Sequence, residues 1–185
     1  MAEQLHFDPI ADATRHWREH WGSATAPPMA AVTSIMRAHQ LILARLNQAL
    51  EPHGLTFSRY EALMLLFYSR TGSLPLGKMG ARLQVHQTSV TPLIDALEHA
   101  GLIRRIPHPT DRRTTLAEIT DNGRRLSTAA TRDLNRLRFG TAPLKRAELE
   151  AITTILERFR REAGDFKLQG AGTPAARPDG GHARM

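Results

Sequence analysis

Apolar residues recur at three- and four-residue intervals along most of this chain, which is the spacing of amphipathic helices. The clearest stripe runs from Val32 to Leu50 and stops at Pro52-His53-Gly54, where proline and glycine interrupt a helix. We therefore expect a mainly α-helical fold. The pattern predicts helices over residues 8–21, from about 29 to 50, from 58 to 70, a short one from 73, from about 88 to 100, from 121 to about 138, and from about 144 to 162.

Polar and small residues indicate where these helices begin. Ser58 is the expected N-cap of its helix, and Glu61, three positions later, would complete a capping box. Ser73, with a proline two positions later, predicts the start of the short helix. Small residues and prolines over 22–28 predict a linker, and the Gly-, Ala-, Pro- and Arg-rich residues 164–185 predict a flexible tail.

A different pattern interrupts the helices after Gly101. Two short apolar runs, Leu102–Ile106 and Thr114–Ile119, flank a turn with two prolines, which predicts a β-hairpin. The turn ends in Asp111-Arg112-Arg113, so the hairpin has a basic tip. A basic hairpin after two short helices is typical of a winged helix-turn-helix DNA-binding domain. The two arginines would enter a minor groove, whose negative potential favours guanidinium groups, and the aspartate would orient an arginine or cap the turn.

The helix before the hairpin combines an apolar side with a polar front. Pro92 is tolerated there if the helix begins about one turn earlier, near Thr88. Pro92 would touch a thymine methyl group and Asp95 would accept from a cytosine amine, although an ordinary solvated face explains this helix equally well when it is taken alone. Arg104 and Arg105 alternate on the following strand, so we expect one of them to face DNA. The predicted DNA contacts are Gln87, Thr88, Ser89, Thr91, Pro92, Asp95, Arg105, Arg112 and Arg113, with Asp111 as support.

Composition agrees with a DNA partner and excludes several other classes. The 185 residues carry a formal net charge of +7, which favours a polyanionic partner. The absence of cysteine excludes a disulfide scaffold, a cysteine-ligated metal site and thiol-based redox sensing. The chain shows no signal-peptide pattern and no membrane-spanning apolar run, so we expect a cytoplasmic protein with no membrane partner.

The stretch Ser58–Gly123 closely resembles the MarR family of winged helix-turn-helix transcriptional regulators. The resemblance rests on Asp111-x-Arg113 followed by Ile119-Thr120-x-x-Gly123, and on Leu97-Glu98-x-x-Gly101-Leu102-Ile103-Arg104-Arg105 before them. The order of the helices extends it to about residues 30–163. The resemblance implies that Arg113 is the minor-groove residue and that the helix containing Pro92 reads the major groove, where many members carry a polar or basic residue instead of this proline.

The resemblance also implies a homodimer, joined through N- and C-terminal helices, that binds a pseudo-palindromic operator. Trp17 and Trp21 would add to that interface, although simple packing of a terminal helix is the more common role of such residues. The implied organisation is an N-terminal arm and linker over 1–28, a regulator domain over 29–163 with a DNA-binding lobe at about 55–123 and dimerisation helices at 29–51 and 124–163, and a tail over 164–185.

Members of the family commonly release DNA when a small aromatic acid or another phenolic compound binds between the dimerisation helices and the DNA-binding lobe. Such a ligand would need apolar walls and a cation for its carboxylate. Each apolar candidate also has a plain interpretation as core, and His39 as an interface histidine. The candidate ligand residues are Arg15, Trp17, Met36, Arg37, His39, Leu43, Tyr60, Met64 and Phe67, with Arg18 and Tyr68 as further possibilities.

Other chemistries fit the chain poorly. Gly72–Lys78 matches the first seven positions of a P-loop, but Met79 stands where the magnesium-binding hydroxyl belongs. His16 and His20 are four residues apart with no third ligand at a suitable spacing, so we expect no metal and no cofactor. No catalytic motif is present, and we expect no enzymatic activity. The alternative function is a constitutive or architectural DNA-binding protein that needs no ligand.

Overall fold

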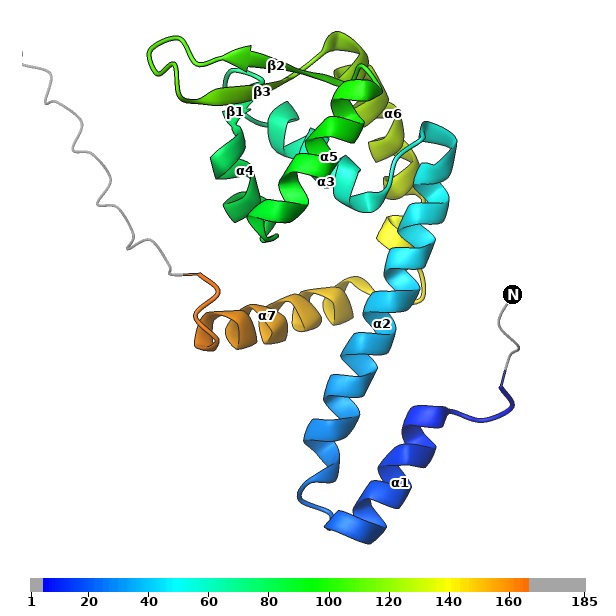
Figure 1. The fold of residues 1–185 in the computed structure, drawn as a ribbon. Coiled ribbons are helices and arrows are strands. Elements are labelled where there is room, and N and C mark those ends of the chain that lie inside the picture. The colour runs from blue at the N-terminus through cyan, green and yellow to red at the C-terminus, as the bar shows by residue number, and fades with distance from the viewer. Residues whose placement is uncertain (1–4, 167–185) are drawn as a thin grey trace, which may run out of the picture. The chain divides into compact units, whose positions relative to one another are not determined.

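The computed structural model describes residues 5–166, except for the side chain of Gln87. The chain divides into two compact units, residues 1–142 and 143–185. Figure 1 shows their elements. The elements of the first unit are α1 (Pro9–Trp21), α2 (Ala26–Leu50), η1 (Glu51–His53), α3 (Phe57–Phe67), β1 (Ser73–Pro75), α4 (Leu76–Leu83), α5 (Gln87–His99), β2 (Ile103–Pro107), β3 (Thr115–Ile119), α6 (Asp121–Arg136) and η2 (Arg138–Gly140), and that of the second is α7 (Arg146–Glu162).

The first two helices are joined by a shorter connection than the sequence predicts. The Asp8 carboxylate caps α1 by accepting from the backbone N–H of Ile10 at 2.9 Å. Helix α2 already begins at Ala26, so the predicted linker over 22–28 is wrong in its last three residues. Pro27 and Pro28 lie in the first turn of α2, where a missing N–H costs nothing because those donors have no partner in the helix.

The start of α3 also differs from the prediction. Thr56 is the N-cap, and its hydroxyl accepts from the backbone N–H of Arg59. The N–H of Phe57, the first residue of the helix, donates to the Asn47 side chain of α2 at 2.8 Å. The predicted Ser58–Glu61 capping box is therefore wrong, because the N-cap lies two residues earlier, where α3 contacts α2.

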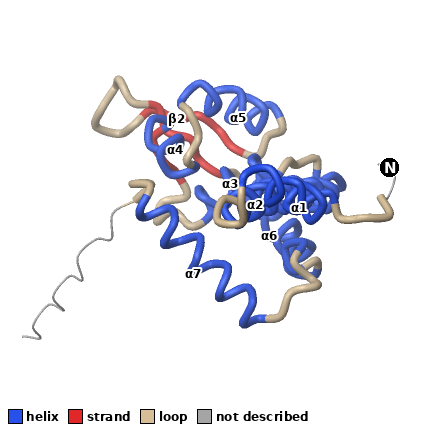
Figure 2. The backbone as a smooth tube through the Cα atoms, turned by 90° about the horizontal axis from the view of Figure 1, so that it is seen from below, coloured by secondary structure: helices blue, strands red, loops and turns tan. Residues whose placement is uncertain are grey.

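The wing is part of a three-stranded antiparallel sheet with strand order β1-β3-β2. Residues Ser73–Pro75, predicted as a helix start, form strand β1, with Leu74 opposite Ala117. The predicted hairpin is confirmed within one residue at each end, with Ile103 opposite Ile119. Figure 2 shows the loop between β2 and β3 extending beyond α4 and α5.

The core of the first unit lies between the sheet and α3, α4 and α5, and α2 and α6 extend it by packing against α3. This packing fixes α5 and the wing relative to each other, because α5 contacts β2 and both bury apolar side chains in the same core. The largest fully buried side chains are Leu50, Leu63, Leu66, Met79, Val90, Ile94, Leu97 and Leu134.

Helix α6 begins against the base of the wing. The Thr120 hydroxyl caps it by accepting from the Gly123 N–H at 3.0 Å, and the same hydroxyl donates to the Gly101 carbonyl at 2.8 Å. A Cβ at Gly123 would lie 2.1 Å from the Leu102 carbonyl oxygen, so only glycine permits this approach.

The second unit contains α7, and the Glu148 side chain caps its start. The backbone N–H of Lys145 donates to the Glu148 carboxylate at 2.6 Å. The helix ends before Gly164, whose φ of 77° lies in the left-handed region. The predicted tail lies outside the described residues from position 167 onward.

Candidate DNA interface

Helix α5 presents the polar front that the sequence predicts. Val90, Ile94 and Leu97 are buried in the core, which turns the opposite side outward. Pro92 lies beyond the first turn of the helix and has no N–H, so it gives no bond to the Thr88 carbonyl. The exposed residues on this side are Thr88, Ser89, Thr91, Pro92 and Asp95.

The wing tip is a turn held by Asp111. One carboxylate oxygen accepts from the Arg113 backbone N–H at 3.0 Å, and the other accepts from the Thr114 hydroxyl at 2.6 Å. Of the two roles the sequence allows, Asp111 therefore caps the turn and contacts the backbone of Arg113, not its guanidinium group. Arg112 and Arg113 are exposed, and within residues 5–166 no hydrogen bond or ion pair engages either guanidinium group. Both side chains are available to a polyanion.

The same bonds favour the ionised form of the Asp111 carboxyl. The Thr114 hydroxyl, and after it the Arg113 N–H, hold the pKa of Asp111 below its ordinary value, because both donors stabilise the ionised form.

Arg105 ties the wing to α5. Its guanidinium Nη2 lies 2.5 Å from the Asp95 carboxylate, and its Nη1 pairs with the Glu98 carboxylate. Glu98 also accepts from the Arg105 backbone N–H at 3.1 Å. The bond to Asp95, more than any other contact, raises the pKa of Arg105. Two residues predicted to contact DNA are thus paired with each other.

Arg104, the neighbour of Arg105 on β2, pairs instead with Glu118 of β3. Its side chain is 68% exposed, against 30% for Arg105. The alternation expected along this strand is confirmed, and each arginine has a carboxylate partner.

Two histidines that the sequence analysis does not single out accept backbone N–H groups at the start of α5 and in the wing turn. The Nδ1 atom of His86, the N-cap of α5, accepts from the Thr88 N–H at 3.3 Å and lies 2.8 Å from the Thr88 hydroxyl. The Nδ1 atom of His108, at the start of the wing turn, accepts from the N–H groups of Thr110 at 3.3 Å and Asp111 at 3.2 Å. Both stand in the pattern His-x-Thr, a signal available in the sequence.

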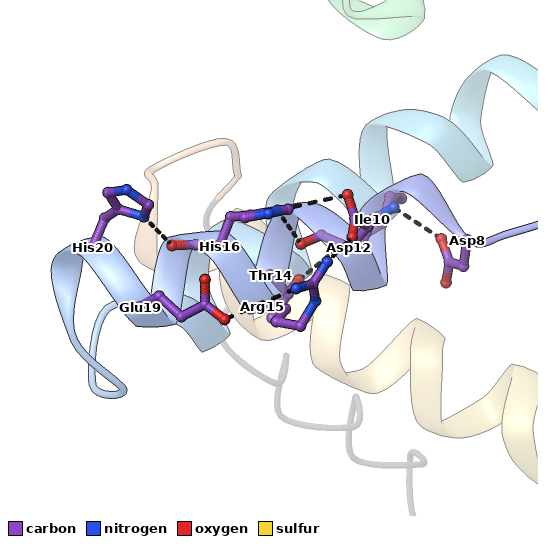
Figure 3. Close-up of polar contacts among 8 residues, drawn as sticks. All are labelled: Asp8, Ile10, Asp12, Thr14, Arg15, His16, Glu19 and His20. Atoms are coloured by element: carbon purple, nitrogen blue, oxygen red, sulfur yellow. Dashed lines mark hydrogen bonds and ion pairs between the residues drawn. The ribbon is translucent and has the colours of Figure 1, made fainter.

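The predicted ligand residues fall into two groups that share no described cavity. The first lies on α1 and α2. Figure 3 shows Arg15 directed toward Asp12, at 2.5 Å, and toward Glu19, at 3.9 Å. Arg37 donates to Gln40 at 3.2 Å. Trp17, Met36 and His39 are exposed, and Leu43 is half-buried.

The second group lies on α3, beside α6. A cavity of about 180 Å³ is lined by Met64, Phe67 and Tyr68 of α3 and by Thr128, Thr131 and Arg132 of α6. Tyr60 is buried, and its hydroxyl lies 2.9 Å from the Thr131 hydroxyl. Apolar walls beside a guanidinium group are the features that an aromatic acid requires.

Helices α2 and α7 each expose large apolar side chains. On α2, Val32, Ile35 and Met36 are 55%, 52% and 61% exposed. On α7, Ile155 and Phe159 are 57% and 69% exposed. Among residues 5–166, no helix is long and apolar enough to cross a membrane, and no group of three or more metal-ligating side chains is arranged to hold an ion.

Comparison with known proteins identifies the family. The MarR family model matches residues 55–115, from two residues before α3 to the first residue of β3. The regulator MhqR of Bacillus subtilis is 35% identical over 89 residues, which are 48% of this chain and 60% of MhqR. The chain thus spans less than two thirds of that relative.

The solved structures cover more of the chain. Sco3205 of Streptomyces coelicolor, a MarR family regulator solved with DNA, is 19% identical, with a TM-score of 0.66 over 75% of this chain and 92% of Sco3205, and shows a shared fold. Sco5413, a MarR family transcriptional regulator from the same organism, is 48% identical, with a TM-score of 0.70 over 76% of this chain and 97% of Sco5413. Identity at that level over nearly all of Sco5413 shows that this chain belongs to the MarR family of transcriptional regulators.

Proposed function

We propose that this protein binds double-stranded DNA sequence-specifically and regulates transcription, with α5 in the major groove and the wing tip in the adjacent minor groove. The observation that carries the proposal is the placement of Arg112 and Arg113, exposed and unpaired within the described chain, on a wing that packs against α5. The α5 front offers hydroxyls and a proline ring to base edges, and free guanidinium groups suit the minor groove.

Within this interface Arg113 is the proposed minor-groove contact and Arg112 a neighbouring phosphate contact. Thr88, Ser89 and Thr91 are the proposed major-groove or phosphate contacts, together with Gln87 and Pro92. Arg105 and Asp95 remain proposed contacts, but each reaches DNA only as part of their ion pair.

We further propose a homodimer that acts as a repressor on a pseudo-palindromic operator, in the cytoplasm. The apolar side chains that α2 exposes support the dimer, because the rest of the first unit leaves them in water. Two copies of α5 would then meet half-sites about one helical turn, or ~10 bp, apart.

A small aromatic or phenolic acid is the proposed releasing ligand, and the cavity between α3 and α6 is its proposed site. CouR of Rhodococcus jostii, which shares the fold, was solved with p-coumaroyl-CoA bound. Met64 and Phe67 would contact the ring and Arg132 the carboxylate. The remaining predicted ligand residues do not line this cavity: Arg15, Trp17, Met36, Arg37, His39, Leu43 and Tyr60.

The test is selection of duplexes from a random pool with the full-length chain, followed by titrations across salt concentration. The proposal expects enrichment of a pseudo-palindrome, and release by a ring-bearing acid such as salicylate. Sequence-independent retention with a steep salt dependence would instead favour the architectural alternative. Operator binding that no acid releases would remove only the sensing role.

A further inference from the structure

We propose that His86 and His108 are positioning residues for DNA binding, which hold the recognition helix and the wing tip in their binding conformations only while their imidazole rings are neutral. This inference rests on the proposed DNA-binding function and adds a protonation requirement to it.

The bonding partners fix the state of both rings. A backbone N–H can only donate, so the ring nitrogen that faces it must carry a lone pair. At His86 the donor is the Thr88 N–H at 3.3 Å, and the Thr88 hydroxyl lies 2.8 Å from the same nitrogen. At His108 the Nδ1 atom faces two N–H groups, those of Thr110 and Asp111. Each neutral ring therefore carries its proton on Nε2.

Protonation would turn each acceptor into a donor. The N–H groups of Thr88, Thr110 and Asp111 would then face another N–H, and the hydrogen bonds would be lost. At α5 the new positive charge would also lie at the helix N-terminus, where the helix dipole disfavours cations. Helix α5 would lose its side-chain cap, and the wing would lose one of the two side chains that hold its turn.

The charged groups around the two rings differ. The Asp111 carboxylate interacts with His108, and Arg112 and Arg113 follow on the same turn. The His86 ring, within the described chain, forms its hydrogen bonds with Thr88, which is uncharged. Helix α4, which packs against α5, carries Lys78 and Arg82, both exposed.

The repeated arrangement gives this inference its weight. The chain has nine histidines, and the pattern His-x-Thr occurs at 86–88 and 108–110 and nowhere else in it. The two occurrences open the two elements proposed to enter the two grooves. In both, the histidine takes the place that Asn or Asp commonly takes in such caps and turns, and asparagine accepts the same N–H without titrating.

The experiment compares three forms at each site by titrating operator DNA at about pH 8 and about pH 5.5. His86→Asn and His108→Asn keep the acceptor, whereas His86→Ala and His108→Ala remove it. At pH 8 we expect the Asn variants to bind like the unmodified protein and each Ala variant to bind about fivefold more weakly. At pH 5.5 the unmodified protein should fall toward the Ala variants, while the double Asn variant should not. His99→Asn, at the exposed far end of α5, is the matched control and should keep the unmodified pH profile.

Two results would overturn the proposal. One is equal affinity of the Ala and Asn variants for operator DNA at pH 8. The other is that acidification makes the unmodified protein bind more tightly than the Asn variants, because the imidazolium would then be a phosphate contact. A measurement without DNA separates these results from failure of DNA binding itself. In the free protein, the amide NMR signals of Thr88, Thr110 and Asp111 should shift over the same pH range, and the Asn variants should abolish those shifts.

Discussion

Arg105 of β2 and Asp95 of α5 form an ion pair, with 2.5 Å between Nη2 and Oδ1, on the side of α5 that is proposed to face DNA. Asp95 places a negative charge where phosphates would approach, and the guanidinium group of Arg105, from the wing, neutralises it. Glu98, one turn further along α5, accepts from the same arginine and fixes its backbone as well.

Removing Arg105 should therefore weaken DNA binding through the charges it leaves behind. Arg105→Ala exposes the Asp95 and Glu98 carboxylates to the phosphates, so we expect it to weaken operator binding more than loss of one positive charge would. Asp95→Asn in the same background should restore about 1 kcal/mol of the loss. Arg104→Ala, on the same strand, is the control. Additive effects of the Arg105 and Asp95 substitutions on affinity would show that the ion pair plays no part in binding.

The wing turn should lose order in acid because of Asp111. The pKa of this carboxyl is lowered in the folded protein, mainly by the Thr114 hydroxyl, so its stabilising effect is present above the ordinary value of 3.8 and is lost as the pH falls through the lowered pKa. Amide NMR shifts of Arg113 and Thr114 should follow this loss below about pH 4. Asp111→Asn should remove that titration, and a titration that persists in the variant would assign it to another group.

Gly123 should not tolerate a methyl group, although alanine is the better helix former. A Cβ there would meet the Leu102 carbonyl oxygen at 2.1 Å and the Ile119 side chain at 2.9 Å. We expect Gly123→Ala to lower the free energy of unfolding by about 1–3 kcal/mol in urea titrations. Gly77→Ala, in α4 with nothing within 4 Å of its Cβ, is the matched control and should be neutral or stabilising. Equal effects of the two substitutions would contradict the close approach at the base of the wing.

The exposed stripe of α2 should be needed for dimerisation. Ile35→Lys places a charge on a side chain that is 52% exposed in the single chain, and it should shift the mass measured by light scattering toward the monomer. Gln48→Lys lies on another face of the same helix and should leave the mass unchanged. A dimer that survives Ile35→Lys would place the interface elsewhere.

The sequence predicts well those features that depend on neighbouring residues. The polar front of α5 follows from helical periodicity, and the two β2–β3 strands from their apolar runs around a turn. Thr120 and Gly123, quoted for the family resemblance, prove to be the cap and the close approach at the base of the wing.

Features that depend on distant contacts were missed or misplaced. Ser73–Pro75 is a strand because Leu116–Glu118, more than forty residues later, pairs with it. Helix α3 begins at Phe57 because Asn47 of α2 accepts its N–H. The partners of Arg105 lie seven and ten residues away, on another element. The histidine caps are local, however, and the His-x-Thr pattern would have revealed them.

The central claim is that the wing tip reads DNA through Arg113, and anisotropy of a labelled operator duplex tests it most directly. Arg113→Ala should cost about 1–3 kcal/mol of operator binding, and the difference between operator and scrambled duplex should shrink. Arg146→Ala removes the same charge from α7, where the side chain is 92% exposed, and should change binding far less. Equal affinities of the unmodified protein and Arg113→Ala for the operator would contradict the account.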